Sequence, residues 1–229
     1  MVGAVGIRAV IFDLDGVLID SEERWARAKE ALVRETGGHW KPEAAHAMLG
    51  MSSTEWSRYL HDELGVPLAP EQINEAVVAR MLEDYRRELP LIEGARDAVL
   101  RLAERWPLAL ASSSNREVID VVLEAAGVAD AFSVTVSSEE VARGKPAPDV
   151  YLEAAARLGV APSEAAAIED STSGLLSAHA AGMAVVAIPN PAFPPSEEAL
   201  AVADIVLDSI VELTPATIES LANASSGER

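Results

Sequence analysis

The chain has 229 residues, enough for one large domain or for one domain that carries an inserted segment. Its net charge of −19 comes from 37 acidic and 18 basic residues, which argues against non-specific binding to nucleic acid or to an acidic membrane surface. The chain contains no Cys. Disulfides and thiolate chemistry are therefore excluded, and any metal must be held by oxygen or His ligands.

Hydrophobic residues make up 49% of the sequence, which is typical of a globular protein. The apolar N-terminal stretch is too short to span a bilayer, contains Arg8, and has no basic region or cleavage signal of a secretory leader. No other stretch approaches the length of a membrane span. We therefore expect a soluble, cytoplasmic protein.

Residues 9–21 read AVIFDLDGVLIDS, and the rest of the chain can be understood from this stretch. Four apolar residues run directly into Asp13, as in a strand that is buried on both faces of a parallel sheet. Asp15 and Gly16 follow. Two neighbouring carboxylates repel each other, so either one stays protonated or a cation lies between them. The alternative is an ordinary turn, with Asp15 as a helix N-cap.

The next seventy residues have a helical pattern and no strand signal. Trp25, Ala28 and Leu32 share one face of the first helix. Glycine and proline residues separate the segments. We expect helices at residues 22–35, 42–49, 52–64 and 71–88.

From residue 91 onward, short apolar runs alternate with helical segments. This alternation predicts an α/β fold with a Rossmann-like parallel sheet and helices on both of its faces. Strands are expected at 108–111, 133–136, 165–168, 184–188 and 204–207, and helices at 94–105, 115–126, 149–158, 171–181 and near the C-terminus. Residues 225–229 are expected to form a frayed tail. Residues 1–20 and 91–229 would form the core, and 21–90 an inserted helical cap that can cover the end of the first strand.

Polar residues follow several of these strands. Asp13, Ser112 and the pair Glu169 and Asp170 end three apolar runs, and Lys145 lies in the loop after a fourth strand. A Ser after a strand is often only a cap, and a loop Lys is often only solvated. Because ligands bind outside the carboxyl ends of parallel strands, the convergence of these residues predicts a site there.

The acidic members of this group favour phosphoryl transfer. Asp13, Asp170 and Glu169 offer the hard oxygen ligands that suit Mg²⁺. A divalent ion would relieve their repulsion and screen an incoming phosphate. Because the chain has no Cys and no suitably placed His, we expect a carboxylate nucleophile and an aspartyl-phosphate intermediate.

The remaining members suit a phosphate group. Ser112 can donate a hydrogen bond to a phosphate oxygen, and Lys145 supplies a positive charge. The backbone N–H groups of Ser113 and Ser114 lie near the start of a helix, where anions bind. Asn115, which follows them, is assigned to the same phosphate-binding group.

The segments IFDLDGVLIDS, ALASSSN, GKPAPD and AIEDS resemble the four motifs of the haloacid dehalogenase-like phosphatases, in the same order and at suitable spacing. The resemblance covers essentially the whole chain, because the helical insert resembles the cap of that family. It implies that Asp13 attacks phosphorus, while Asp15 protonates the leaving oxygen and then activates water. True dehalogenases of this fold lack the second Asp, so Asp15 argues against dehalogenation.

The resemblance also assigns the other site residues. It implies that Ser112 and Lys145 hold the transferring phosphoryl group. Glu169 and Asp170, together with the nucleophile and the backbone carbonyl of Asp15, are implied as ligands of Mg²⁺.

Two cap segments, DSEERWARA and MLGMSSTEW, are similar to the branch that contains 2-deoxyglucose-6-phosphate and hexitol phosphatases. β-Phosphoglucomutase is a close neighbour, but it has a His at the position of Trp25 and an Arg at the position of Ser53. Both differences weaken a mutase assignment. Trp25 either contacts substrate or packs within the cap.

The sequence therefore predicts a Mg²⁺-dependent phosphatase that acts on a small phosphorylated metabolite, with a sugar phosphate as the first expectation. The alternatives are a β-phosphoglucomutase-type phosphomutase, a phosphoglycolate phosphatase and a non-catalytic phospho-ligand binder. The last would be expected to lack Asp13, Asp15, Lys145 or Asp170, and all four are present. No nucleic-acid or membrane partner is expected, and the chain is expected to be a monomer or a weak dimer.

Overall fold

Strand β1 (Ala9–Phe12) lies inside a six-stranded parallel sheet, between β2 and β4, in the computed structural model, which describes residues 6–224. The strand order is β3-β2-β1-β4-β5-β6, and every neighbouring pair is parallel. This arrangement confirms the predicted fold class. The other strands are β2 (Leu108–Ser112), β3 (Phe132–Ser137), β4 (Ala165–Glu169), β5 (Ala184–Ala187) and β6 (Ile205–Val206).

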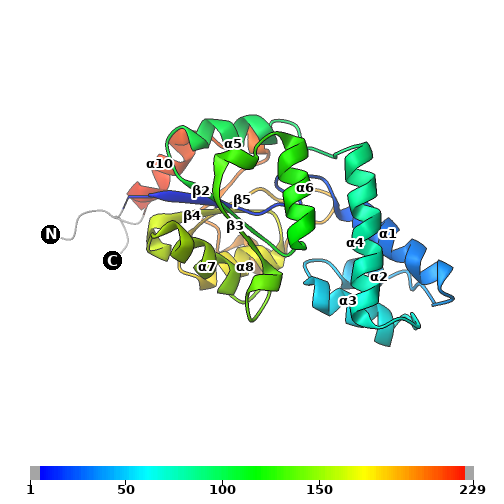
Figure 1. The fold of residues 1–229 in the computed structure, drawn as a ribbon. Helices are drawn as coiled ribbons and strands as arrows, with labels where there is room; N and C mark the ends of the chain where they lie inside the picture. The colour runs from blue at the N-terminus through cyan, green and yellow to red at the C-terminus, as the bar shows by residue number, and fades with distance from the viewer. Residues whose placement is uncertain (1–5, 225–229) are drawn as a thin grey trace.

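Helices cover both faces of the sheet, which explains why β1 has no polar residue. Val10 and Phe12 belong to one buried apolar cluster, and Ile11 belongs to another, because successive side chains point to opposite faces. Figure 1 shows α5 and α10 over one face and α7 and α8 over the other. The helices after residue 94 include α5 (Ala95–Ala103), α6 (Arg116–Ala126), α7 (Asp149–Leu158), α8 (Thr172–Ala180) and α10 (Pro215–Ala224).

Four of the five helices between β1 and β2 lie together beyond the end of the sheet (Figure 1). They are α1 (Glu22–Glu35), α2 (Ala44–Ala47), α3 (Ser53–Asp62) and α4 (Pro70–Arg87). The chain leaves and returns side by side, since Asp20 N–H donates to the Pro90 carbonyl at 2.8 Å and Ile92 N–H to the Leu18 carbonyl at 2.9 Å. The assignment of residues 21–90 as a separate cap domain stays a prediction.

Short elements account for most differences from the sequence-based expectations. The helix expected at 42–49 is only the four-residue α2. A further helix, α9 (Glu197–Leu200), lies in a segment expected to be a proline-rich loop, and the Ser196 side chain caps it by accepting from Ala199 N–H. The tail expected at 225–229 lies outside the described residues. Within residues 6–224, no helix combines the length and the apolar character that crossing a membrane requires.

Candidate active site

A cavity of about 390 Å³ lies where the carboxyl ends of the central strands face the helices α1, α2 and α3. It is lined from both sides, so it is the place at which the predicted site residues and the helical insert meet. The sheet side contributes Asp13, Asp15, Ser113, Ser114, Asn115, Lys145 and Asp170. The helical side contributes Glu22, Trp25, Lys29, Met48 and Trp56.

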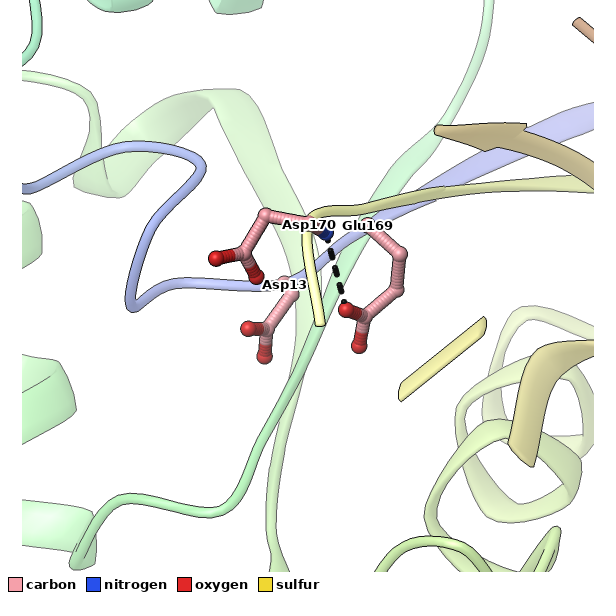
Figure 2. A group of neighbouring side chains, drawn as sticks. All are labelled: Asp13, Glu169 and Asp170. Carbon is pink, nitrogen blue, oxygen red and sulfur yellow. Dashed lines mark hydrogen bonds between the residues drawn. The ribbon is translucent and has the colours of Figure 1, made fainter. Parts of the chain in front are cut away.

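Three carboxylates form an acidic cluster at the floor of this region. Asp13, Glu169 and Asp170 each offer an oxygen, and these oxygens lie within 4.8 Å of one another. Figure 2 shows the three side chains converging from the ends of β1 and β4, with the Asp170 N–H donating to Glu169 Oε2 at 3.0 Å. Asp170 Oδ1 is buried and has no hydrogen-bond partner among residues 6–224. An unpaired buried carboxylate oxygen beside two others fits a hard cation such as Mg²⁺.

Lys145 supplies the one ammonium group that directly contacts the cluster in the described part of the chain. Its Nζ donates to Asp13 Oδ1 at 2.7 Å and to Glu169 Oε1 at 2.6 Å, and its side chain is only 3% exposed. Burial lowers the pKa of Lys145, but the charges of Asp13 and Glu169 outweigh it and hold this pKa above its usual value. Lys145 is therefore charged and fixed beside the predicted nucleophile.

Glu169 is held by donors at both of its carboxylate oxygens. Oε1 accepts from Lys145 and from the Tyr151 hydroxyl at 2.9 Å. Oε2 accepts from the N–H of Asp170, and from the N–H and hydroxyl of Ser171 at 3.2 and 3.1 Å. Glycine at 174 leaves room for this carboxylate, because a Cβ there would lie 1.8 Å from Oε1. Glu169 therefore orients Lys145 and the turn that carries Asp170.

The cluster has more negative than positive charge. Burial raises the pKa of Asp13 to about 8, with Glu169 and Asp15 adding to the rise and Lys145 opposing it. Burial, followed by the charges of Glu169 and Asp13, also raises the pKa of Asp170. Without a cation, the site therefore favours protonated carboxyl groups, and a divalent ion would favour their ionised forms.

Asp15 points away from the acidic cluster and toward the helical side of the cavity. Its Oδ1 accepts from the Ser21 hydroxyl at 2.5 Å and from the Trp25 indole N–H at 3.1 Å. Its Oδ2 accepts from the Ser114 hydroxyl at 2.6 Å. The N-cap position of α1 belongs to Ser21, so Asp15 is not the helix cap that the sequence left open. Its side chain is not part of the acidic cluster.

The end of β2 and the segment after it contain one residue that lies away from the cavity and three that line it. Ser112 is fully buried, and its hydroxyl accepts from Ser114 N–H at 3.0 Å; it is not one of the residues that line the cavity. Ser113, Ser114 and Asn115 do line it. The Asn115 amide donates to Glu139 Oε1 at 2.7 Å, which joins the start of α6 to the loop after β3. The predicted contact of Ser112 with a phosphoryl group stays a prediction.

The polar residues of α1 that line the cavity were not predicted from the sequence. Lys29 is buried, with its Nζ 5.5 Å from the ring centroid of Trp25 and 5.0 Å from that of Trp56. Lys29 follows Trp25 by four residues and precedes Leu32 by three, which is the spacing of the apolar face. A lysine on that face was the signal that could have identified it.

Comparison with known proteins gives one family model that matches residues 7–182, described as haloacid dehalogenase-like hydrolase. Hexitol phosphatase B of Escherichia coli K12 is 34% identical over 214 residues, which cover 91% of this chain and 95% of that protein. These matches include both the sheet and the helical insert.

Solved structures agree with the fold. CbbY of Rhodobacter sphaeroides, solved in complex with phosphate, superposes with a TM-score of 0.83 at 29% identity and covers 93% of this chain and 99% of its own. β-Phosphoglucomutase of Clostridium difficile has a TM-score of 0.83 at 23% identity, with 97% and 100% covered. At that identity, the second likeness concerns the fold alone.

Proposed function

The chain belongs to the family of haloacid dehalogenase-like hydrolases and is a phosphoric monoester hydrolase; from this premise we propose that it hydrolyses a sugar phosphate in a Mg²⁺-dependent reaction. The observation that carries the proposal is the pairing of buried Asp13 with Lys145, beside an Asp170 carboxylate oxygen that has no hydrogen-bond partner among the described residues. This arrangement supplies a fixed nucleophile, a positive charge and an open ligand position.

Asp13 and Asp170 are the side chains that would hold the metal ion, with the Asp15 carbonyl as a further ligand. When bound, Mg²⁺ neutralises the clustered carboxylates and the charge of the phosphoryl group. Both oxygens of Glu169 already accept hydrogen bonds, so we assign Glu169 to the ion through water. Its direct partners remain Lys145 and the turn that carries Asp170.

In the first step, an Asp13 oxygen attacks phosphorus and the bond from phosphorus to the ester oxygen breaks. Asp15 gives its proton to that oxygen, and the alcohol leaves. Lys145, Ser112 and the N–H groups after β2 hold the transferring phosphoryl oxygens. Ser113, Ser114 and Asn115 form the wall on that side.

In the second step, Asp15 takes a proton from a water molecule, which attacks the phosphorus of the phosphorylated Asp13. The bond between phosphorus and the Asp13 oxygen breaks, and phosphate and the free carboxylate result. The hydrogen bonds from Ser21, Trp25 and Ser114 to Asp15 support this role, because they hold the carboxylate in one position for both transfers.

The relatives support a small hydroxylated substrate. One is named a hexitol phosphatase, and CbbY of Rhodobacter sphaeroides was solved in complex with phosphate. The cavity of about 390 Å³ has the size of a small-molecule site. We take residues 21–90 as a cap that closes this cavity during turnover.

The experiment that tests this proposal is phosphate release from a panel of phosphorylated sugars by the full chain, with Mg²⁺ and with EDTA. We expect turnover with Mg²⁺ and none with EDTA. The Asp13→Asn variant should lose at least about a thousandfold in kcat, because the nucleophile is removed. The matched control, Asp20→Asn, changes an exposed carboxylate of the same segment and should keep its activity. Turnover by a folded Asp13→Asn variant at the wild-type rate would refute the proposal.

A phosphomutase is distinguished in the same assay. Incubation with β-glucose 1-phosphate and a bisphosphate primer should release free phosphate if the chain is a phosphatase. Net formation of glucose 6-phosphate with little free phosphate would favour the mutase instead.

A further inference from the structure

Lys29 is a buried ammonium group in the wall of the cavity, and it has no hydrogen-bond partner in the part of the chain that the structure describes. The chain has three lysines, at positions 29, 41 and 145. Lys145 is fixed by the acidic cluster, and Lys41 forms an ion pair with Glu63 at 3.5 Å. Lys29 is 7% exposed and lines the cavity, yet no hydrogen bond or ion pair reaches its Nζ from residues 6–224. Its N–H donors are therefore available to a ligand in the cavity.

Glu22 lies two turns before Lys29 on the same helix and lines the same cavity. Burial lowers the pKa of Lys29 to about 8, and the charges of Glu22 and Asp15 oppose this change. The two groups are thus close enough to influence each other, but no ion pair joins them in the described part of the chain. The Glu22 carboxylate is an acceptor and the Lys29 ammonium group is a donor. Both therefore line the cavity without being paired with each other.

Two indole rings complete this end of the cavity. The ring centroids of Trp25 and Trp56 are 6.1 Å apart, and the rings are inclined at 51°. The Trp25 N–H is already donated to Asp15, so Trp25 has only its ring to offer a ligand. Aromatic faces that surround a few fixed polar groups are the usual composition of a small-molecule site.

We propose that Lys29 and Glu22, between the rings of Trp25 and Trp56, bind the uncharged hydroxyl groups of a sugar or polyol monophosphate. This inference rests on the proposed function, which puts the phosphate of the substrate at Asp13. A hydroxyl group both donates and accepts, so it can satisfy Glu22 and Lys29 together. A carboxylate or a second phosphate would pair with Lys29 but would be repelled by Glu22 and Asp15. The site therefore selects monophosphates with a neutral, hydroxylated end.

The test compares three substrates of the full chain with Mg²⁺: D-glucitol 6-phosphate, 2-phosphoglycolate and p-nitrophenyl phosphate. The wild-type chain should prefer D-glucitol 6-phosphate to 2-phosphoglycolate by at least about tenfold in kcat/KM, because only the former has hydroxyls for both charged groups. The Lys29→Met variant should lose about tenfold or more for D-glucitol 6-phosphate, mainly in KM, because a hydrogen bond to a charged group is lost. Its loss on p-nitrophenyl phosphate, which has no distal hydroxyl, should be several-fold smaller, so the ratio of the two activities should change.

Lys41→Met is the matched control, since it removes an exposed lysine from the same helical segment. Lys29→Leu, which also removes the N–H donors, is the second variant, in case Lys29→Met does not fold. An unchanged ratio between D-glucitol 6-phosphate and p-nitrophenyl phosphate in either folded variant would overturn the inference. A wild-type preference for 2-phosphoglycolate would also overturn it.

Binding separates this inference from the proposed function. D-Glucitol 6-phosphate binding to the Asp13→Asn variant can be followed by tryptophan fluorescence, because the site contains Trp25 and Trp56. Adding Lys29→Met should weaken this binding about tenfold; equal affinity overturns the inference. If the wild-type chain hydrolyses no phosphate ester, the proposed function fails, whereas the binding result still decides the role of Lys29.

Discussion

The carboxylate of Asp15 receives hydrogen bonds from three side chains, and two of them, Ser21 and Trp25, belong to the helical insert of residues 21–90. Ser21 and Ser114 donate through their hydroxyls, and Trp25 donates its indole N–H at 3.1 Å. The proton-transfer group of the proposed mechanism is therefore positioned partly by α1. Loss of the Trp25 indole N–H should therefore affect chemistry on any substrate.

We predict that Trp25→Phe lowers kcat on p-nitrophenyl phosphate by about tenfold, because a hydrogen bond to a charged group is worth about 1.5–3 kcal/mol and two other donors remain. Steady-state kinetics measure the effect. Trp40→Phe is the control, because Trp40 is half-buried in the same segment and does not line the cavity. Equal kcat values for the two variants would contradict the positioning role of the indole.

At the scale of single residues, the sequence predicted the members of the site better than their contacts. Asp13, Asp170 and Lys145 could be identified because each follows a strand of a parallel sheet, and the structure brings them together. A lysine on the apolar face of α1 indicated that Lys29 is buried, but that signal could not distinguish a residue of the cavity wall from one that packs inside the insert. The Lys29 Nζ also lies beside the Trp56 ring. Trp56 is distant in sequence, so its position next to Lys29 depends on tertiary packing.

The turn from β4 into α8 connects secondary structure to the site. Ser171 caps α8 by accepting from Gly174 N–H at 3.1 Å, while its own N–H and hydroxyl donate to Glu169. Gly174 lies in the first turn of the helix, where a Cβ would lie 1.8 Å from Glu169 Oε1. The Glu169 carboxylate therefore requires glycine at this position, although the backbone N–H that Ser171 accepts from could come from any residue except Pro.

We predict that Gly174→Ala destabilises the protein by about 1–3 kcal/mol through steric overlap, although Ala normally stabilises a helix by about 0.5–1 kcal/mol relative to Gly. Urea unfolding measures the difference. Ser173→Ala, at the neighbouring position, is the control and should change stability by less than about 0.5 kcal/mol. A more stable Gly174→Ala variant would show that the Glu169 carboxylate is not held where we describe it.

Element boundaries followed from local signals where those signals were strong. β1 and α7 begin and end at the predicted residues, because an unbroken apolar run and a terminal glycine define them. α9 was missed because prolines at positions 191, 194 and 195 suggested a loop, whereas they only precede the Ser196 cap. The helix predicted at 42–49 is too long. Gly50 suggested that it ends at 49, whereas α2 ends at Ala47.

The stability of the whole molecule should depend on pH through the acidic cluster when no metal is bound. The pKa of Asp13 is about 8 in the folded chain, against a usual value of 3.8. Between these values the folded state retains a proton that the unfolded state has released. The contribution of Asp13 to the free energy of unfolding is therefore fully present below about pH 4 and decreases as pH rises toward 8.

We predict that the melting temperature in EDTA falls from pH 5 to pH 8 more steeply for the wild-type chain than for Asp13→Asn, which has no such proton to lose. Each kcal/mol lost corresponds to about 2–4 °C in a chain of this size. Thermal unfolding followed by circular dichroism at both pH values measures the two slopes. Parallel slopes would mean that Asp13 does not titrate in this range.

The proposed mechanism requires that Asp13 becomes phosphorylated during turnover. The Asp15→Asn variant cannot activate water, but it can still transfer phosphoryl from p-nitrophenyl phosphate, whose leaving group needs no proton. Acid quenching followed by mass spectrometry measures the peptide that contains Asp13. We predict that this peptide gains the mass of one phosphoryl group, on Asp13. Stoichiometric release of p-nitrophenol without a phosphorylated Asp13 would contradict the account.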